Sequence, residues 1–225
     1  MLKVSDKIML DNIESFKLFL LIAIYMKLEN LILKNFKIIK VPIGISNSHV
    51  HLTKKKVELL FGRDYELKKR NDISQPGQYA CKETIEIVTE KGKINCRVVG
   101  PCRDNVQVEM SQTDAIKLEI NAPIRLSGDI KKSGSAKLVG PGGECILKEG
   151  IIIAARHVHL SEKEAKKFKL KNNDIVNLAV KTKRGYNVLG NVICRTGNYK
   201  LDVHLDTDEA NAIGIKKGDK GYIFY

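Results

Sequence analysis

The chain has 225 residues, of which 43% are hydrophobic, enough to bury one large core or two small ones. Its formal net charge of +13 predicts an anionic partner. Nucleic acid is disfavoured because the lysines are dispersed and no basic segment is interleaved with aromatic residues or patterned as a helix-turn-helix, whereas a small molecule carrying several phosphates satisfies the same charge.

The first predicted element is a helix over residues 7–35. Its apolar side chains recur at helical spacing: Ile13, Phe16, Leu20 and Ile24. The longest uncharged run, residues 18–26, is too short to span a bilayer, and acids in the leading segment disfavour a signal peptide. We expect residues 1–36 to be an N-terminal helical extension that packs on the body, forms a homo-oligomer interface or docks on a larger assembly.

Two copies of the tetrapeptide His-Val-His-Leu follow, at residues 49–52 and 157–160. In an extended strand, residues i and i+2 point to the same face, so each copy places two imidazoles side by side. Neutral imidazole is a ligand for zinc and related transition metals. A single His-x-His in a β protein is more often structural than metal-binding, but scattered core histidines do not repeat a tetrapeptide. The duplication therefore favours metal binding.

The repeat continues beyond the histidines. Each copy is followed by a helix-capping residue, Thr53 or Ser161, and a short helix, over residues 54–61 in the first copy; Ser161 has capping-box spacing with Glu164. Alternating apolar and polar runs around Lys/Gly turns then predict two hairpins: residues 84–89 with 94–99, and residues 175–181 with 186–193. The sequence therefore predicts a mainly β fold with short helices and an internal duplication.

A third candidate ligand lies at the same place in each copy, Glu109 in Gln-Val-Glu and His204 in Asp-Val-His. Each follows an arginine, Arg103 or Arg195, and we expect the two arginines to be equivalent. Three protein ligands with an open position are typical of catalytic zinc, whereas structural zinc usually has four ligands. The two predicted ligand sets are His49, His51 and Glu109, and His157, His159 and His204.

The cysteines form no Cys-x-x-Cys pair and are odd in number: Cys81, Cys96, Cys102, Cys145 and Cys194. Irregular spacing and an odd count fit reduced thiols in a cytosol better than a disulfide framework. Cys102 stands next to Arg103 and near Glu109, which makes it a candidate ligand or nucleophile, but we expect it to be a small buried side chain.

Six motifs occur in a fixed order along the chain. They are Val-Pro-Ile-Gly-Ile-Ser-Asn-Ser-His-Val-His-Leu-Thr (41–53), Ser-Gln-Pro-Gly-Gln-Tyr-Ala (74–80), Arg-Val-Val-Gly-Pro-Cys-Arg (97–103), Gln-Val-Glu (107–109), Ala-Arg-His-Val-His-Leu-Ser (155–161) and Asp-Val-His-Leu-Asp (202–206). Together they resemble the phosphate propanoyltransferase family, the PduL-type phosphotransacylases of bacterial microcompartments and acyl-phosphate metabolism. The resemblance extends from about residue 41 to the C-terminus.

The resemblance implies reversible transfer of a propanoyl or acetyl group between coenzyme A and inorganic phosphate, on two zinc ions per chain. It also implies two tandem β-barrel domains, one built from residues 37–46 and 155–225 and a central one from residues 47–154. Acyl-CoA and phosphate are then the substrates, and no membrane partner is expected. The implied location is the cytoplasm, either free or inside a bacterial microcompartment for propanediol degradation, with residues 1–36 contacting shell or cargo.

The resemblance also assigns roles to single residues. The two ligand sets agree with those from the internal repeat, and Glu109 is counted as catalytic as well as metal-binding. Arg103 matches the phosphate-binding arginine, a catalytic role that suits its planar fork of donors. The positions that match coenzyme A contacts are Ile45, Ser46, Asn47, Lys91, Arg97 and Asn211. Without the resemblance, Ser46 and Asn47 read as ordinary turn residues.

Two other classes of protein remain open at this point. A metal-dependent hydrolase of the amidohydrolase type uses similar histidines, but on a (β/α)8 barrel of about 250 residues with regular strand and helix alternation. A non-enzymatic scaffold stabilised by zinc is the other class, and the open three-ligand sets disfavour it. The preferred acyl group is left undetermined, because a methylene changes pocket binding by only about 1–3 kcal/mol.

Overall fold

The computed structural model describes residues 37–225, so the predicted N-terminal helical extension, residues 1–36, lies outside the described residues. Residues 40–223 form one compact unit. Lys37 and Tyr225 belong to a second unit, in which they pair through backbone hydrogen bonds of 3.0 and 3.3 Å. No helix in the described part of the chain is long and apolar enough to cross a membrane.

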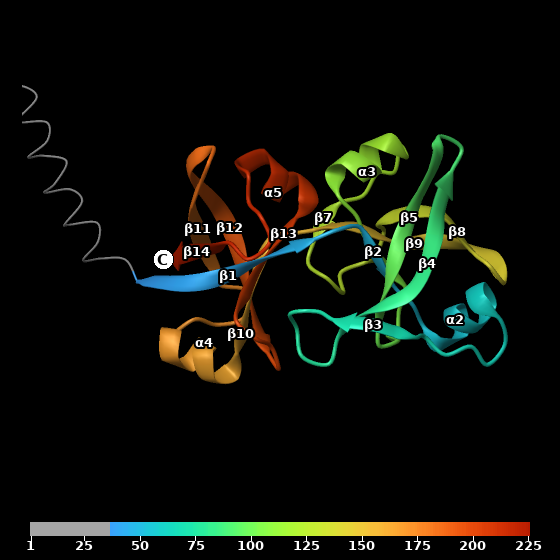
Figure 1. Ribbon diagram of the computed structural model, residues 1–225, viewed down its shortest axis with the longest axis horizontal. Coiled ribbons are helices and arrows are strands. Elements are labelled where there is room, and N and C mark those ends of the chain that lie inside the picture. Colours follow the sequence, from blue (N-terminus) through green and yellow to red (C-terminus); the bar gives the residue numbers. More distant parts are fainter. Residues whose placement is uncertain (1–36) are drawn as a thin grey trace, which may run out of the picture. The chain divides into compact units, whose positions relative to one another are not determined.

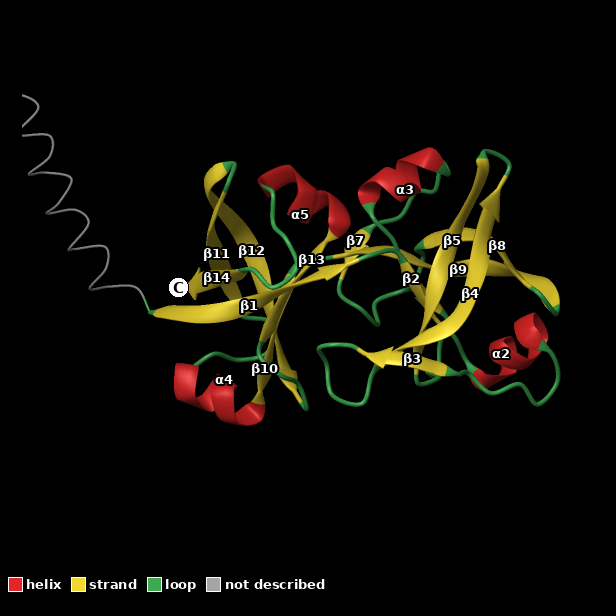
Figure 2. Ribbon diagram, in the orientation of Figure 1, coloured by secondary structure: helices red, strands yellow, loops and turns green. Residues whose placement is uncertain are grey.

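Six strands close a first barrel, which we call the C-terminal barrel (Figures 1 and 2). In order around the barrel they are β1 (Ile38–Ser46), β13 (Asp202–Asp206), β10 (His157–Ser161), β12 (Gly185–Gly197), β11 (Ile175–Thr182) and β14 (Lys220–Phe224). Because β1 pairs in parallel with β13, the start of the described chain belongs to the same barrel as its end.

Six further strands form a second closed ring, which we call the central barrel (Figure 1). In order they are β4 (Tyr79–Thr89), β5 (Gly92–Gly100), β2 (His49–His51), β6 (Gln107–Glu109), β9 (Gly143–Ala154) and β8 (Gly134–Gly140), which returns to β4. Two short strands extend this sheet: β3 (Lys69–Asp72) beside β4, and β7 (Ile124–Arg125) beside β9. The predicted mainly β fold with two barrels is confirmed.

The internal duplication extends to strand pairing. β2 pairs in parallel with β5 and antiparallel with β6, and β10 pairs in parallel with β12 and antiparallel with β13. Both predicted hairpins are present, with Thr89 opposite Gly92 in one and Thr182 opposite Gly185 in the other. The two barrels are therefore copies of one arrangement of strands.

Short helices follow the strands that carry the histidines, as the sequence predicts. The Thr53 side chain accepts from the Lys56 backbone N–H at 3.2 Å, and Ser161 forms the full capping box with Glu164. Two more helices follow β6 and β13, the strands of Glu109 and His204. The four helices described are α2 (Lys54–Phe61), α3 (Gln112–Lys117), α4 (Glu162–Phe168) and α5 (Thr207–Ile213).

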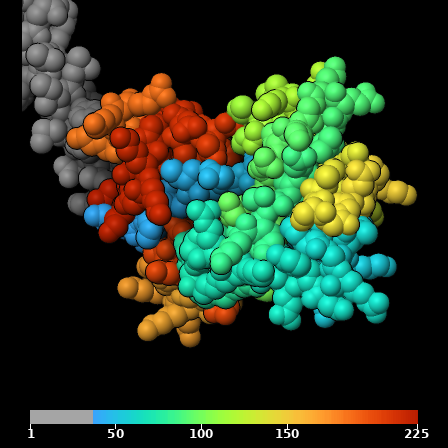
Figure 3. Space-filling model, turned by 45° about the vertical axis from the view of Figure 1, so that its right-hand side comes forward, coloured from blue at the N-terminus to red at the C-terminus, as the bar shows by residue number. Residues whose placement is uncertain are grey.

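Alternating burial along the strands gives each barrel an apolar interior. In β4, Ile85 and Ile87 are buried (1% and 0% exposed) and Glu86 between them pairs with Lys93 at the surface. In Figure 3, part of β1 (blue) lies between surface formed by C-terminal residues (red) and by central residues (green). Since residues 40–223 form one compact unit, the division into domains at residues 46 and 154 stays a prediction.

Candidate functional site

The first ligand set stands on the paired strands β2 and β6. Val50 is fully buried in the central core, so His49 and His51 on either side of it project from the opposite face of the strand. Their rings meet edge to face with centroids 5.0 Å apart. Glu109 lies opposite His49, and its Oε2 is 3.7 Å from His49 Nε2. The prediction that these three residues converge is confirmed.

The second ligand set repeats this geometry on β10 and β13. Val158 is fully buried, and His204 lies opposite His157 in the register of the two strands. The ring centroid of His159 is 4.6 Å from that of His157 and 4.7 Å from that of His204. In each set, one donor atom from each of the three residues lies within 4.8 Å of the others.

Backbone carbonyls orient three of the five imidazole rings through Nδ1. The pairs are His49 with the Asn47 oxygen, 2.8 Å; His157 with the Ala155 oxygen, 2.8 Å; and His51 with the Val99 oxygen, 3.1 Å. The bonds of His49 and His157 are equivalent, because each reaches the carbonyl two residues earlier. When Nδ1–H donates to a carbonyl, Nε2 keeps its lone pair and is available to a metal.

Burial keeps three of the rings in their neutral form. It lowers the pKa of His51 to about 3, that of His157 to about 4 and that of His159 to about 2. Burial raises the pKa of Glu109, but the neighbouring histidines outweigh this effect and hold that pKa at about 2. At neutral pH these three histidines therefore offer neutral imidazoles and Glu109 offers a carboxylate, the forms that bind transition metals.

Both sets fit a zinc-like ion by their donor chemistry. Each joins three nitrogen or oxygen donors on paired strands, and backbone carbonyls hold three of the five rings in position. His159 Nδ1 is buried and has no hydrogen-bond partner among residues 37–225. Three ligands leave a further coordination position open to a substrate, which is the arrangement of catalytic zinc.

All six ligand residues line one cavity of about 970 Å³. Its wall comes from both barrels: the first ligand set belongs to the central barrel and the second to the C-terminal barrel. Three arginines, Arg97, Arg103 and Arg195, lie on the same wall. The cavity therefore combines two candidate metal sites with positive charge.

The Arg103 side chain is held by neutral partners. Its backbone N–H donates to the Leu52 carbonyl at 2.9 Å, and its guanidinium donates to Ser127 Oγ at 3.2 Å and to Gln78 Oε1 at 3.3 Å. Burial lowers its pKa, yet an arginine remains charged at neutral pH. Arg195 donates to the Ser127 carbonyl at 3.0 Å. None of these guanidinium hydrogen bonds goes to a carboxylate, so the positive charges of both arginines remain on the cavity wall.

The expected equivalence of these arginines is wrong. Arg195 belongs to β12 and lies opposite His159, whereas Arg103 belongs to the loop between β5 and β6. In the central barrel, His49 pairs with Arg97, so the residue that corresponds to Arg195 is Val99. The number of residues between the arginine and the third ligand differs in the two copies. The register of the parallel strand pairs shows which residues of the two copies correspond.

The cavity wall includes four of the six positions predicted to contact coenzyme A: Ile45, Ser46, Asn47 and Arg97. Lys91 lies at the β4–β5 turn, where its Nζ is 3.2 Å from Glu119 Oε1, and Asn211 lies in α5, where its carbonyl accepts from Arg184. Neither Lys91 nor Asn211 lines the cavity. The coenzyme A role of all six stays a prediction.

Several polar residues in or beside the ligand sets were missed by sequence reasoning. Asp202 and Gln107 each stand two residues before the third ligand, so the i, i+2 rule applied to His-x-His would have found them. Gln78 lies in the motif of residues 74–80, which was noted without a role for this side chain. Ser127 and Tyr199 come from loops without periodic pattern, and no signal in the single sequence marks them. Tyr199 packs on His159 with centroids 4.3 Å apart.

The cysteines divide by burial. Cys81, Cys96 and Cys194 are buried, and burial raises the pKa of each thiol. Cys102 is exposed, so the expectation that it is buried is wrong; it lies in the loop after β5, outside the core. It does not line the cavity, and it belongs to neither ligand set. All five thiols are free, as predicted.

Comparison with known proteins gives a consistent result. Residues 42–216 match the sequence profile described as phosphate propanoyltransferase. A phosphate propanoyltransferase of Thermotoga maritima is 43% identical over 183 residues, which is 80% of this chain and 87% of the relative. Proteins of the same name are 46% identical over 184 residues in Priestia megaterium (81% and 85%) and 43% identical over 179 residues in Clostridioides difficile (79% and 86%).

Proposed function

The chain belongs to the phosphate propanoyltransferase family, and from that membership we propose that it transfers a short acyl group, propanoyl or acetyl, reversibly between coenzyme A and inorganic phosphate. One observation carries the proposal: both three-ligand sets and three arginines, Arg97, Arg103 and Arg195, line a single cavity of about 970 Å³. A cavity of this size accommodates a cofactor-sized ligand beside a small anion.

Each ligand set would hold one zinc ion, with three protein donors and a position left for a substrate. Zinc, when bound, would stabilise the coenzyme A sulfur as a thiolate and polarise the acyl carbonyl. The protein's own part is to keep the imidazoles neutral and oriented. Burial and the bonds from Nδ1 to backbone carbonyls do this before any ion arrives.

Arg103 would bind inorganic phosphate. Its guanidinium lies in the cavity with no carboxylate hydrogen-bonded to it, and Ser127 and Gln78 hold it in place. A planar fork of N–H donors matches two phosphate oxygens. Arg195, which donates to the carbonyl of the same Ser127, adds a second positive charge close by. Because both charges are already in the cavity, binding phosphate requires no large rearrangement.

Coenzyme A would approach along the wall formed by the end of β1 and the loop that follows it, where Ile45, Ser46 and Asn47 lie. Asn47 is tied to α5 through Thr207 Oγ1, which donates to Asn47 Oδ1 at 3.0 Å. The Asn47 carbonyl also accepts from His49, so the proposed coenzyme A wall and the first ligand set share one backbone segment. The sulfur end of the substrate is thereby directed toward the ligand sets.

The reaction needs no amino-acid nucleophile. A phosphate oxygen attacks the acyl carbon, the carbon–sulfur bond breaks, and coenzyme A leaves as the thiolate. Arg103 would hold the attacking phosphate, Glu109 would serve as a ligand of the first set, and the wall at Ile45, Ser46 and Asn47 would hold coenzyme A. Fixing two substrates in one cavity removes much of the entropic barrier of a bimolecular reaction.

The strand arrangement argues against the hydrolase alternative. Amidohydrolases use eight parallel strands alternating with helices, whereas the strands described here form two rings of mixed direction with short peripheral helices. A zinc-stabilised scaffold does not account for Arg103 and Arg195, which line the cavity beside the ligand sets and are hydrogen-bonded only to neutral oxygens. A location inside a microcompartment, and contact of residues 1–36 with shell or cargo, are part of the proposal that the family resemblance alone supports.

The test follows free thiol after propanoyl-CoA or acetyl-CoA is mixed with the full chain and phosphate. We expect thiol release that requires phosphate, yields acyl phosphate in equal amount and stops when a chelator removes the metal. Thiol release without phosphate would identify a thioesterase instead. Absence of thiol release from the metal-loaded protein with both acyl donors would contradict the proposal.

A further inference from the structure

The two ligand sets share a further pair of equivalent residues. Asp202 lies opposite His159 in the β10–β13 pair, and Gln107 lies opposite His51 in the β2–β6 pair. Each stands two residues before the third ligand of its set, His204 or Glu109, on the same face of the strand. Both are buried, at 4% and 3% exposed. The duplication thus includes a polar partner for the third ligand.

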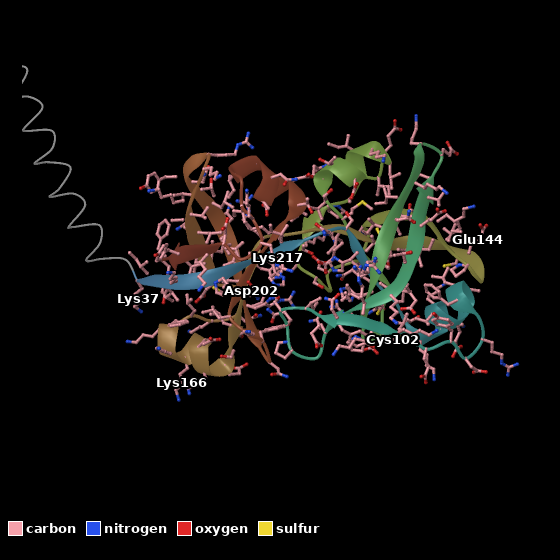
Figure 4. All side chains as sticks on the ribbon, in the orientation of Figure 1. Lys37, Cys102, Glu144, Lys166, Asp202 and Lys217 are labelled. Atoms are coloured by element: carbon pink, nitrogen blue, oxygen red, sulfur yellow. The ribbon has the colours of Figure 1, made fainter. Side chains whose placement is uncertain are left out.

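Asp202 engages the Nε2 side of the His204 ring. The Asp202 Oδ2 oxygen is 3.1 Å from His204 Nε2, and Ser74 Oγ lies 3.2 Å from the same nitrogen. Figure 4 labels Asp202 among the side chains. β1 closes against this pair at Gly44, where an added Cβ would lie 3.0 Å from Asp202 Oδ2 and 3.1 Å from His204 Cδ2. The ring therefore presents Nε2 to protein oxygens and has Nδ1 left for a metal. This is the reverse of His49, His51 and His157.

Gln107 makes the opposite kind of contact. Its Nε2 donates to Glu109 Oε1 at 2.6 Å and to Ser127 Oγ at 2.8 Å, and its Oε1 accepts from the Gly128 N–H at 2.7 Å. Gln107 therefore donates to a carboxylate ligand, whereas Asp202 accepts from an imidazole ligand. A donor withdraws electron density from its ligand, and an anionic acceptor adds density to its own.

We propose that Asp202 is a positioning residue that makes His204 bind its metal through Nδ1 and strengthens that bond, so that His204 differs from His157 of the same site, whose free nitrogen is Nε2. The inference rests on the two-metal site of the proposed function. Asp202 Oδ1 has no hydrogen-bond partner among the described residues, so the contact to His204 is the one hydrogen bond through which this buried carboxylate acts there. Removal of Asp202 should weaken the second site and leave the first unchanged.

The experiment compares the zinc-loaded full chain with Asp202→Ala, Asp202→Asn and the matched variant Gln107→Ala. Transfer of zinc to a chromogenic chelator measures the affinity of each site, and ¹⁵N NMR of the histidine side chains identifies the metal-bound nitrogen. To assign the sites, the same substitutions are repeated with His51→Gln, which removes a ligand of the first set. In the native chain we expect His204 bound through Nδ1 and protonated at Nε2.

Loss of a partner of this kind costs about 10- to 100-fold in metal affinity. We expect that loss at the second site in Asp202→Ala, and a smaller loss in Asp202→Asn, whose Oδ1 still accepts from Nε2–H and keeps the Nδ1 pattern. Gln107→Ala should affect the first site only. Asp202→Asn keeps the test decisive where Asp202→Ala does not fold.

Three results would overturn the inference: His204 bound through Nε2 in the native chain, equal weakening of both sites by Asp202→Asn, or native affinity in Asp202→Ala. These leave the proposed function intact if the native chain holds two ions and transfers acyl groups. A native chain that transfers acyl groups without metal would instead contradict the proposed two-zinc site and this inference together.

Discussion

His49 lies directly opposite Glu109 on antiparallel strands, with His49 Nε2 3.7 Å from Glu109 Oε2. His157 and His204 occupy the same register in the second copy. A repeated peptide alone could fold into different surroundings, but a repeated register places three side chains at one point twice. Because the two points face one cavity, the duplication has produced a pair of ligand sets that line the same space.

We expect two zinc-like ions per chain. The variants His51→Gln and His159→Gln each remove a ligand from one set and should each reduce the content to about one ion. Elemental analysis of the purified chains gives the measurement. Cys102→Ser is the matched control, because this exposed thiol belongs to neither set, and it should keep both ions. An unchanged metal content in His159→Gln would exclude the second site.

Arg103→Ala should raise the KM for phosphate by about 10- to 100-fold, the loss that corresponds to about 1.5–3 kcal/mol for a hydrogen bond to a charged group. The KM for acyl-CoA should change much less. Arg103→Lys keeps the charge but not the fork and should recover part of the loss. Arg125→Ala is the control, since Arg125 pairs with Asp129 away from the cavity wall. Equal damage to both substrates would contradict the phosphate role.

The residues that the sequence predicted well were those whose signal is local. The His-x-His pairs, the caps at Thr53 and Ser161, and both hairpins depend on neighbours along the chain, and all are present. The parallel pairing of β1 with β13 joins segments far apart in sequence, and periodicity carries no information about it. The resemblance to a known family, not the pattern of residues, supplied the barrel topology.

The predictions that were wrong concern residues whose position depends on strand register or on a loop, which local sequence patterns do not determine. Arg103 and Arg195 were matched by their order before a ligand, but the parallel register of β5 and β12 decides which residues correspond. Cys102 was expected inside the core because free cysteines usually are, yet a loop position overrides that preference. Ser127, which contacts Arg103 and Gln107, lies in a loop whose sequence shows no motif.

The metal-free chain should lose stability as the pH falls below about 6.5. In the unfolded chain, histidine takes up a proton near its ordinary pKa of about 6.5, whereas burial holds the folded pKa of His51 at about 3 and that of His159 at about 2. Between these values the unfolded state binds more protons, so the free energy of unfolding decreases with falling pH. Each ring that stays neutral contributes about 1.4 kcal/mol per pH unit.

Urea unfolding of chelator-treated protein between pH 7 and pH 5 measures this dependence. His159→Gln should show a shallower decrease than the native chain, because glutamine takes up no proton in either state. Identical pH profiles for the two chains would show that His159 is not buried in a neutral form.

Deletion of residues 1–36 should leave both metal sites and most of the turnover intact. Every cavity-lining residue lies at position 42 or later, and the family match begins at residue 42. The sequence predicts an apolar helix face in the deleted segment, formed by Ile13, Phe16, Leu20 and Ile24. Such a face contributes burial, at about 25 cal/mol per Å², to association and not to chemistry. We therefore expect light scattering to report smaller particles for the truncated chain, with similar rates of thiol release.

A full-length chain carrying Phe16→Asp and Leu20→Asp separates the apolar face from the mere length of the segment. If that face drives association, this variant should behave as the truncated chain does, because two charges on the predicted contact surface oppose its burial. If it associates as the native chain does while the truncated chain does not, other residues of the segment make the contact. Loss of soluble folded protein on truncation, with the metal sites lost as well, would show that residues 1–36 belong to the core and that the boundary at residue 36 is wrong.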